Sequence, residues 1–288
     1  MNKDNQVSTS TQEAEQDSQW IGERRQVSGA PYMLPDADQE IDRLDLQHYM
    51  LRYVLKGNYL APIAEPARIL DVGCGTGRWL AEMAQEFPRA EAIGIDLTPP
   101  EMGSAMFPPN CQFQQANTLN GLPFEDNSFD FVHQRLLLFA IPAARWPQLI
   151  QELVRVTRVQ GWIELTEVDP LFQHIGPATE RVLDLVVRAM QQLGMDPAIG
   201  HHIGPHLQAA GLAHVETSTR LIPCGKWAGR LGSIALADVM AIAQALKPVV
   251  AAQKQTTLEE YDSLMAQMEE EVEQYHTTFN FHFAYGQR

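Results

Sequence analysis

Three glycines at alternate positions, Gly73, Gly75 and Gly77, are the residues of this sequence best suited to hold a ligand. They follow a short apolar run that ends in Asp71, and a helical pattern begins near Arg78. Glycine has no Cβ, so such a turn can adopt unusual backbone angles and let a ligand lie against the main chain. Two ligand classes use a turn of this kind, nucleotides that carry a pyrophosphate and S-adenosylmethionine.

The spacing favours the second class. The dinucleotide fingerprint places its last glycine at the position of Arg78, where helix and strand pack closely beneath a pyrophosphate. A buried carboxylate at Asp71 also suits an ammonium or sulfonium better than a phosphate. A second apolar run, residues 90–96, ends in Asp96, where a carboxylate can accept hydrogen bonds from both ribose hydroxyls. We expect Asp96 to bind a ribose; a solvated aspartate at a strand end is the alternative.

Histidine, glutamate and arginine side chains supply candidates for the chemical step. Methyl transfer needs an acceptor held in line with an activated methyl group and, for many acceptors, a base. The candidate bases are His133, Glu167 and His174, and Arg135 could bind an anionic acceptor or pair with an acid. A purely structural role is the alternative for each of them.

A group of histidines, His201, His202 and His206, raises the question of a metal site. His202 and His206 have the i, i+4 spacing of two ligands on one helix face. Gly204 and Pro205 lie between them and argue against a regular helix. We therefore expect loop or lid residues here and no metal.

Composition narrows the class of protein. The chain has 288 residues and a formal net charge of −15. Such acidity disfavours nucleic acid and membrane surfaces as partners. The odd cysteine count, without CxxC, predicts reduced thiols in a cytosolic compartment and no zinc site. No apolar run approaches the roughly 18 residues of a membrane span, and the amino terminus has no signal pattern. We expect a cytoplasmic protein with a small-molecule partner; a homodimer is compatible with the sequence.

Strand patterns that alternate with helical patterns predict a parallel sheet with helices on both faces. The expected strands are a run ending at Asp71 and residues 90–96, 111–115, 129–133, 162–168, 215–222 and 278–285. Ligands of such sheets bind at the carboxyl ends of the strands. This edge brings together Asp71, Asp96, Asn117, residues 133–135 and Glu167.

The chain divides into three parts. Residues 1–20 are polar and predict a disordered tail. Residues 21–60 contain an amphipathic helix with Asp36 as its N-cap, and they predict a helical cap on the sheet. Residues 61–288 form the main domain, with a helical insertion at about 225–275 that could cover an acceptor.

Several of these segments resemble one family. Residues 69–79, Asp96 and residues 121–130 resemble motifs of class I S-adenosylmethionine-dependent methyltransferases. Residues 32–49, 133–146 and 161–167 are similar to bacterial small-molecule methyltransferases and to LaeA-like methyltransferases of fungal secondary metabolism. The resemblance runs from about Tyr32 to the end and is weakest over 225–275. It implies a Rossmann-like α/β fold, with a seven-stranded, mostly parallel sheet whose last strand is antiparallel.

The resemblance also implies contacts to S-adenosylmethionine. They are Asp71, Gly73 and Gly75 for the methionine end, Asp96 for the ribose, Leu97 for the adenine face, Asn117 and Thr118 for the adenine edge, the Gln134 backbone for the amino group, and Tyr32, Arg43 and Gln47 for the methionine carboxylate. The family more often has aspartate at the position of Asn117. It usually has Pro-Gly-Gly at residues 159–161, which changes the expected turn before the fifth strand but not the site.

Three functions remain compatible with the sequence. The first is methyl transfer to O, N or C of a small organic acceptor in specialised metabolism, giving S-adenosylhomocysteine. The second is a LaeA-like regulatory protein that binds S-adenosylmethionine without methylating a small molecule. The third, an NAD-dependent oxidoreductase, is disfavoured by Arg78. No motif in the insertion identifies the acceptor.

Overall fold

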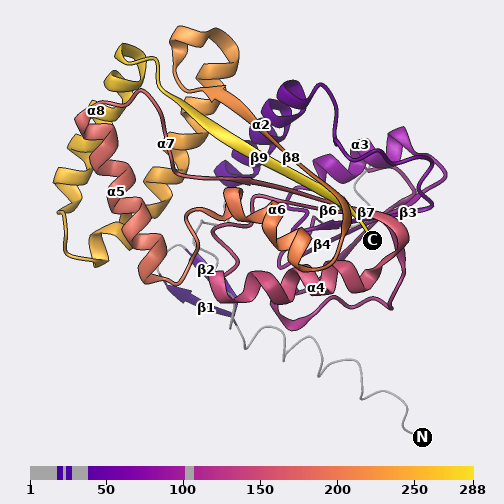
Figure 1. Cartoon of the computed structure of the whole chain (residues 1–288). Helices are drawn as coiled ribbons and strands as arrows, with labels where there is room; N and C mark the ends of the chain where they lie inside the picture. Colours follow the sequence, from indigo (N-terminus) through magenta and orange to yellow (C-terminus); the bar gives the residue numbers. More distant parts are fainter. Residues whose placement is uncertain (1–17, 22–23, 28–37, 101–106) are drawn as a thin grey trace, which may run out of the picture.

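The computed structural model describes residues 18–21, 24–27, 38–100 and 107–288 (Figure 1). Tyr32, the expected cap Asp36 and residues 1–17 of the expected tail lie outside the described residues. Residues 18–20 belong to a strand that the sequence did not predict. In it, β1 (Ser18–Ile21) pairs with β2 (Arg24–Val27) in a separate two-stranded antiparallel sheet.

A seven-stranded sheet forms the centre of the protein, in the order β5-β4-β3-β6-β7-β9-β8. The strands are β3 (Arg68–Val72), β4 (Glu91–Asp96), β5 (Cys111–Gln115), β6 (Phe129–Arg135), β7 (Thr157–Val168), β8 (Ala213–Pro223) and β9 (Thr278–Gln287). β9 lies antiparallel to both β7 and β8, whereas the pairs from β5 to β7 are parallel. The predicted mostly parallel sheet with an antiparallel last strand is therefore confirmed.

Alternate residues of the sheet pack against helices on opposite faces. Ile69 and Phe131 contact the core beneath α3 (Arg78–Glu86), which contributes Trp79. Leu70 and Val132 belong to the core under α4 (Trp146–Val156). This period of two is what a sheet covered on both faces requires, and it fixes which side chains can reach each face.

The turn expected at residues 159–161 is instead part of β7. Gln160 has a φ of 65°, yet its backbone N–H donates to the carbonyl of Arg288 at 2.7 Å. The Arg288 N–H in turn donates to the carbonyl of Gly161 at 3.0 Å. The end of the chain thus supplies the partners that extend this strand, and a local sequence pattern does not contain that information.

Helices cover the carboxyl end of the sheet. They are α2 (Asp38–Leu55), before the sheet, and α5 (Pro177–Gln192), α7 (Gly229–Ala252) and α8 (Leu258–Gln274), after it. Figure 1 shows α5, α7 and α8 grouped at one end of the molecule, away from α3 and α4. Short 3₁₀ turns lie at Thr118–Asn120, Ala143–Arg145 and Lys226–Ala228.

The helical segment 226–252 is long and apolar enough to cross a membrane, by length and composition alone. The sequence had been expected to contain no apolar run of that length. The same property is found in core helices of soluble proteins. Here α7 carries Asp238 on its buried side and contacts α2, α5, α8 and β8.

The expectation of a loop around His201–His206 is wrong, because Ile199–Ala209 forms the helix α6. Pro205 within a helix costs about 3 kcal/mol. Ile199, Ile203 and Leu207 are almost fully buried against the sheet, and each such side chain contributes about 1.5–3 kcal/mol. Tertiary packing therefore outweighs the local penalty.

Candidate functional site

The glycine turn joins the end of β3 to α3. Backbone N–H groups of Gly73 and Cys74 donate to the carbonyl of Ile95 at 2.8 and 3.0 Å, which ties the turn to β4. Gly73 has a φ of 74°, and a Cβ built there would lie 2.6 Å from Cδ2 of Leu137. The left-handed backbone angle therefore favours glycine, as the sequence predicted, whereas the close contact is with the end of a flexible leucine side chain.

Asp96 closes the same turn from the end of β4. Its Oδ2 accepts a hydrogen bond from the Gly75 N–H at 2.9 Å, and its Oδ1 accepts one from the Thr98 N–H at 3.1 Å. Burial raises the pKa of this carboxyl, and the two backbone hydrogen bonds oppose that shift. Each oxygen keeps further acceptor capacity, which suits a carboxylate that receives sugar hydroxyls.

The helix α2 is fastened to the glycine turn by one acid. Asp45 accepts hydrogen bonds from Oγ1 of Thr76 and from Nε of Arg78, each at 2.8 Å. Leu44, next to it, would lie 3.5 Å from a Cβ on Gly75. Arg78, which replaces the glycine of a dinucleotide fingerprint, is thus part of the attachment between the cap helix and the turn.

Arg43 and Gln47 point to a partner that the sequence did not predict. Nη1 of Arg43 lies 2.5 Å from Oδ1 of Asp238, and Nε2 of Gln47 lies 3.0 Å from Oδ2. Asp238 belongs to α7, so α2 touches the glycine turn on one side and the insertion on the other. Asp238 is the only acidic residue in the apolar helix α7. A buried acid in such a helix needs a polar partner, so its presence in the sequence could have indicated this contact.

Asp71 and His133 form a buried pair across β3 and β6. Oδ1 of Asp71 lies 2.8 Å from Nδ1 of His133, whose ring stacks on Trp79 with centroids 3.7 Å apart. Burial lowers the pKa of His133, although the contact with Asp71 opposes this. The structure therefore encloses this candidate base and gives the strand-end acid a protein partner.

Glu167 binds the segment that follows β6. Its Oε1 accepts hydrogen bonds from Nε2 of Gln134 at 2.7 Å and from the Leu137 N–H at 2.8 Å. Burial raises the pKa of Glu167 to about 8. Leu137 is also the side chain that covers Gly73, so this carboxyl positions one wall of the glycine turn.

The other predicted residues lie at separate places. Asn117 accepts a hydrogen bond from the Leu119 N–H at 3.0 Å and caps a 3₁₀ turn that includes Thr118. The carbonyl of Leu97 accepts from Gln115. Arg135 contacts His48 of α2 at 3.2 Å, and His174 lies exposed on the loop before α5.

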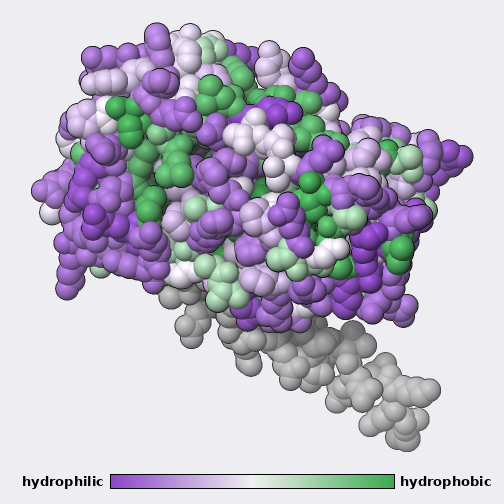
Figure 2. All heavy atoms as spheres, in the orientation of Figure 1, coloured by the Kyte–Doolittle hydropathy of each residue, from purple (hydrophilic) through white to green (hydrophobic). Residues whose placement is uncertain are grey.

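An apolar pocket lies between the end of β7 and the inserted helices. Its lining side chains include Phe172, Val186, Ile242 and Phe281, and its polar members are Gln47, Asp169 and Asp238. Figure 2 shows hydrophobic residues gathered where α5 and α7 meet. The pocket therefore adjoins α2, the helix that also contacts the glycine turn. None of the three candidate bases is among its lining residues.

The comparisons with known proteins agree with this geometry. The family described as "Methyltransferase domain" matches residues 69–161. Methyltransferase str2 of Strobilurus tenacellus is 32% identical over 62% of this chain and 66% of its own length. The secondary metabolism regulator LAE1 of Cochliobolus heterostrophus is 30% identical over 68% of this chain and 67% of its own. This chain belongs to the class I S-adenosylmethionine-dependent methyltransferases.

A third relative in this family aligns along most of the chain. The N-methyltransferase gliN of Aspergillus fumigatus is 26% identical over 89% of this chain and 96% of its own length. For the two Strobilurus methyltransferases, str2 and str3, the chain spans 66% and 62% of their length.

S-adenosylmethionine, the methyl donor of this family, fits the residues present. The left-handed backbone at Gly73 favours glycine, and Asp96 is a half-buried carboxyl at the end of β4, the edge where a nucleoside would bind. The described hydrogen bonds to Asp96 come from backbone N–H groups, and its two oxygens keep acceptor capacity for ribose hydroxyls. Because the chain belongs to this family, we no longer consider an NAD-dependent oxidoreductase.

Proposed function

We propose that this methyltransferase methylates a small, mainly apolar organic acceptor that binds between β7, α5 and α7. The observation that carries the proposal is the apolar pocket, whose polar lining residues include Gln47 of α2 and its partner Asp238. Ligand pockets typically combine such a lining with a few placed polar groups. The names of str2 and gliN support a role in specialised metabolism.

The contribution of this chain's residues is then mainly to bind the methyl donor and the acceptor and to orient them toward each other. S-adenosylmethionine supplies an activated methyl group. Asp96 and the glycine turn would hold its nucleoside, and α2 would cover its amino acid end. The helices α5 and α7 would hold the acceptor and exclude water, because proximity and orientation can supply a large part of such a rate enhancement.

The candidate bases have different surroundings. His133 is enclosed by Asp71 and Trp79, and Glu167 is bound to Gln134 and Leu137. His174 is exposed, away from the pocket lining. These placements support positioning roles for His133 and Glu167. They also favour an acceptor that accepts the methyl group without help from a buried base.

An acceptor screen tests the proposal. The purified chain is incubated with methyl-labelled S-adenosylmethionine and a panel of apolar phenols, amines and carboxylic acids, and labelled product is measured. Ile242→Trp should fill the pocket and abolish transfer while the affinity for S-adenosylhomocysteine stays unchanged. Ile242→Leu, which keeps the side-chain volume, is the matched control. Transfer that persists in Ile242→Trp would place the acceptor elsewhere.

A LaeA-like regulatory role is the second candidate, because LAE1 shares 30% identity with this chain. In that case the protein would bind S-adenosylhomocysteine with the expected dependence on Asp96 but would methylate no member of the panel. The two readouts, cofactor binding and transfer, therefore separate the two candidates.

A further inference from the structure

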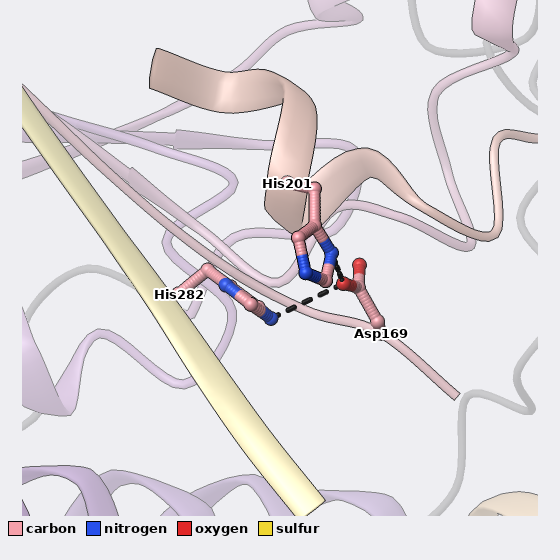
Figure 3. Close-up of side chains that lie close together, drawn as sticks. All are labelled: Asp169, His201 and His282. Carbon is pink, nitrogen blue, oxygen red and sulfur yellow. Dashed lines mark ion pairs between the residues drawn. The ribbon is translucent and has the colours of Figure 1, made fainter. Parts of the chain in front are cut away.

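The side chains of Asp169, His201 and His282 come together from three separate elements (Figure 3). Asp169 directly follows β7, His201 lies in the first turn of α6, and His282 lies within β9. One donor atom from each lies within 4.8 Å of the others. From this arrangement, we propose that these three residues bind one divalent transition-metal ion of the zinc type.

The donor set matches that class of ion. Two imidazole nitrogens and one carboxylate oxygen suit Zn²⁺ and its neighbours, whereas Ca²⁺ and Mg²⁺ prefer oxygen ligands only. The His282 Nε2 lies 3.1 Å from Asp169 Oδ2, and Nδ1 of His201 contacts the same oxygen. The two imidazole rings have their centroids 4.3 Å apart. All three donors thus face one small volume.

The remaining polar atoms of the two buried ligands are held by the protein. Nδ1 of His282 lies 3.3 Å from Oγ1 of Thr219, and Oδ1 of Asp169 accepts a hydrogen bond from the Gly200 N–H at 2.8 Å. Such outer contacts fix the orientation of a metal ligand and select the ring nitrogen that faces the ion. Here they direct Nε2 and Oδ2 toward His201.

Packing of α6 places the third ligand. A Cβ on Gly200 would lie 2.6 Å from both Asp169 Oδ1 and His282 Cδ2, so only glycine lets the helix approach this closely. His201 follows it and is 54% exposed, whereas Asp169 is 1% and His282 7% exposed. Two rigid ligands and one at the surface provide an entry path and leave coordination positions for water.

The proposed site can be tested by metal binding alone, without S-adenosylmethionine or an acceptor. Full-length protein without a histidine tag is treated with chelator, dialysed and titrated with Zn²⁺ by calorimetry. We expect one ion per chain and a higher melting temperature when Zn²⁺ is present. Co²⁺ should give a visible absorption band without a thiolate charge-transfer band, because the three cysteines are free and lie elsewhere.

His201→Ala should weaken Zn²⁺ binding by more than about tenfold, since even outer partners of a metal ligand contribute that much. The matched control is His202→Ala, because His202 is 50% exposed on the same helix and pairs with Asp196 instead. Circular dichroism confirms that both variants fold. The proposal is overturned if the wild type shows no saturable binding, or if His202→Ala and not His201→Ala removes it.

Discussion

Arg43 of α2 and Asp238 of α7, which are 195 residues apart in the sequence, form a buried ion pair. Arg43 is 8% and Asp238 5% exposed. Because Asp45 of the same α2 helix holds Thr76 and Arg78, a single helix links the glycine turn to the insertion that lines the pocket. The helix α2 therefore contacts both the glycine turn, where the cofactor is expected to bind, and the proposed acceptor pocket.

Removing one member of this pair should destabilise the protein strongly. Asp238→Ala removes the carboxylate that contacts the buried Arg43 guanidinium at 2.5 Å, and removing one member of a buried ion pair typically costs about 3–5 kcal/mol. Urea denaturation of Asp238→Ala, Arg43→Met and the double variant measures this. We expect the double variant to lose less stability than the sum of the single variants. Additive losses would show that the two side chains do not depend on each other.

Asp96→Ala should weaken binding of S-adenosylhomocysteine by about 1–3 kcal/mol, because charged hydrogen bonds to the sugar are lost. Calorimetry measures the affinity. Asp96→Asn is the control, since it retains an oxygen that can accept from the Gly75 N–H and so preserves the turn. An affinity in Asp96→Ala equal to that of the wild type would contradict the ribose assignment.

The strand positions could be predicted from sequence because their signals are local. Short apolar runs, the alternation in residues 278–285 and the glycine turn all depend on neighbouring residues. The antiparallel direction of the last strand was expected only from the family resemblance, because strand direction depends on long-range pairing. The α6 helix was missed for a related reason. Pro205 is a local penalty, whereas the compensating burial of Ile203 and Leu207 depends on β7 and β9, which are distant in the chain.

The site residues show the same division. Gly73 and Asp96 lie where the motif placed them, because the motif encodes a local turn. Long-range partners were not predictable from spacing. Arg43 was expected near a cofactor carboxylate, and its contact with Asp238 of α7 could not be read from sequence spacing. Likewise His201 was considered with its neighbours in sequence, whereas its partners are Asp169, just after β7, and His282 of β9.

Two helix glycines should respond differently to alanine. A Cβ on Gly232 of α7 would lie 2.1 Å from the backbone carbonyl oxygen of Gly225, and backbone cannot move aside cheaply. A Cβ on Gly204 of α6 would meet only the methyl group of Thr217, an exposed side chain on the edge strand β8. Alanine gains about 1 kcal/mol of helix propensity over glycine, but at Gly204 the ring of Pro205 disfavours a Cβ on the preceding helical residue and offsets this gain.

We therefore expect Gly232→Ala to lose about 1–3 kcal/mol through overpacking, and Gly204→Ala to be close to neutral. Thermal and urea unfolding of the two variants measure the difference. Equal effects would mean that helix propensity, and not the close approach of the chain at Gly225, determines the outcome.

Glu164 should make the folded state less stable as the pH rises. Its Oε2 accepts hydrogen bonds from the N–H groups of Leu60 and Ala61 at 2.8 and 2.6 Å, and burial raises its pKa from 4.5 to about 7. Between those two pH values the folded protein binds more protons than the unfolded chain, so the unfolding free energy falls as the pH increases. The full effect is about 3 kcal/mol.

Glu164→Gln removes this titration and keeps an oxygen acceptor for the two N–H groups. Urea unfolding of wild type and variant at half-unit steps from pH 4.5 to 8 gives the difference in stability at each pH. That difference isolates Glu164 from His48 and His133, whose lowered pKa values act in the opposite direction as acid is added. We expect the variant to gain relative to the wild type by about 3 kcal/mol across this range. A constant difference would show that the carboxyl titrates at the same pH in the folded and unfolded chains.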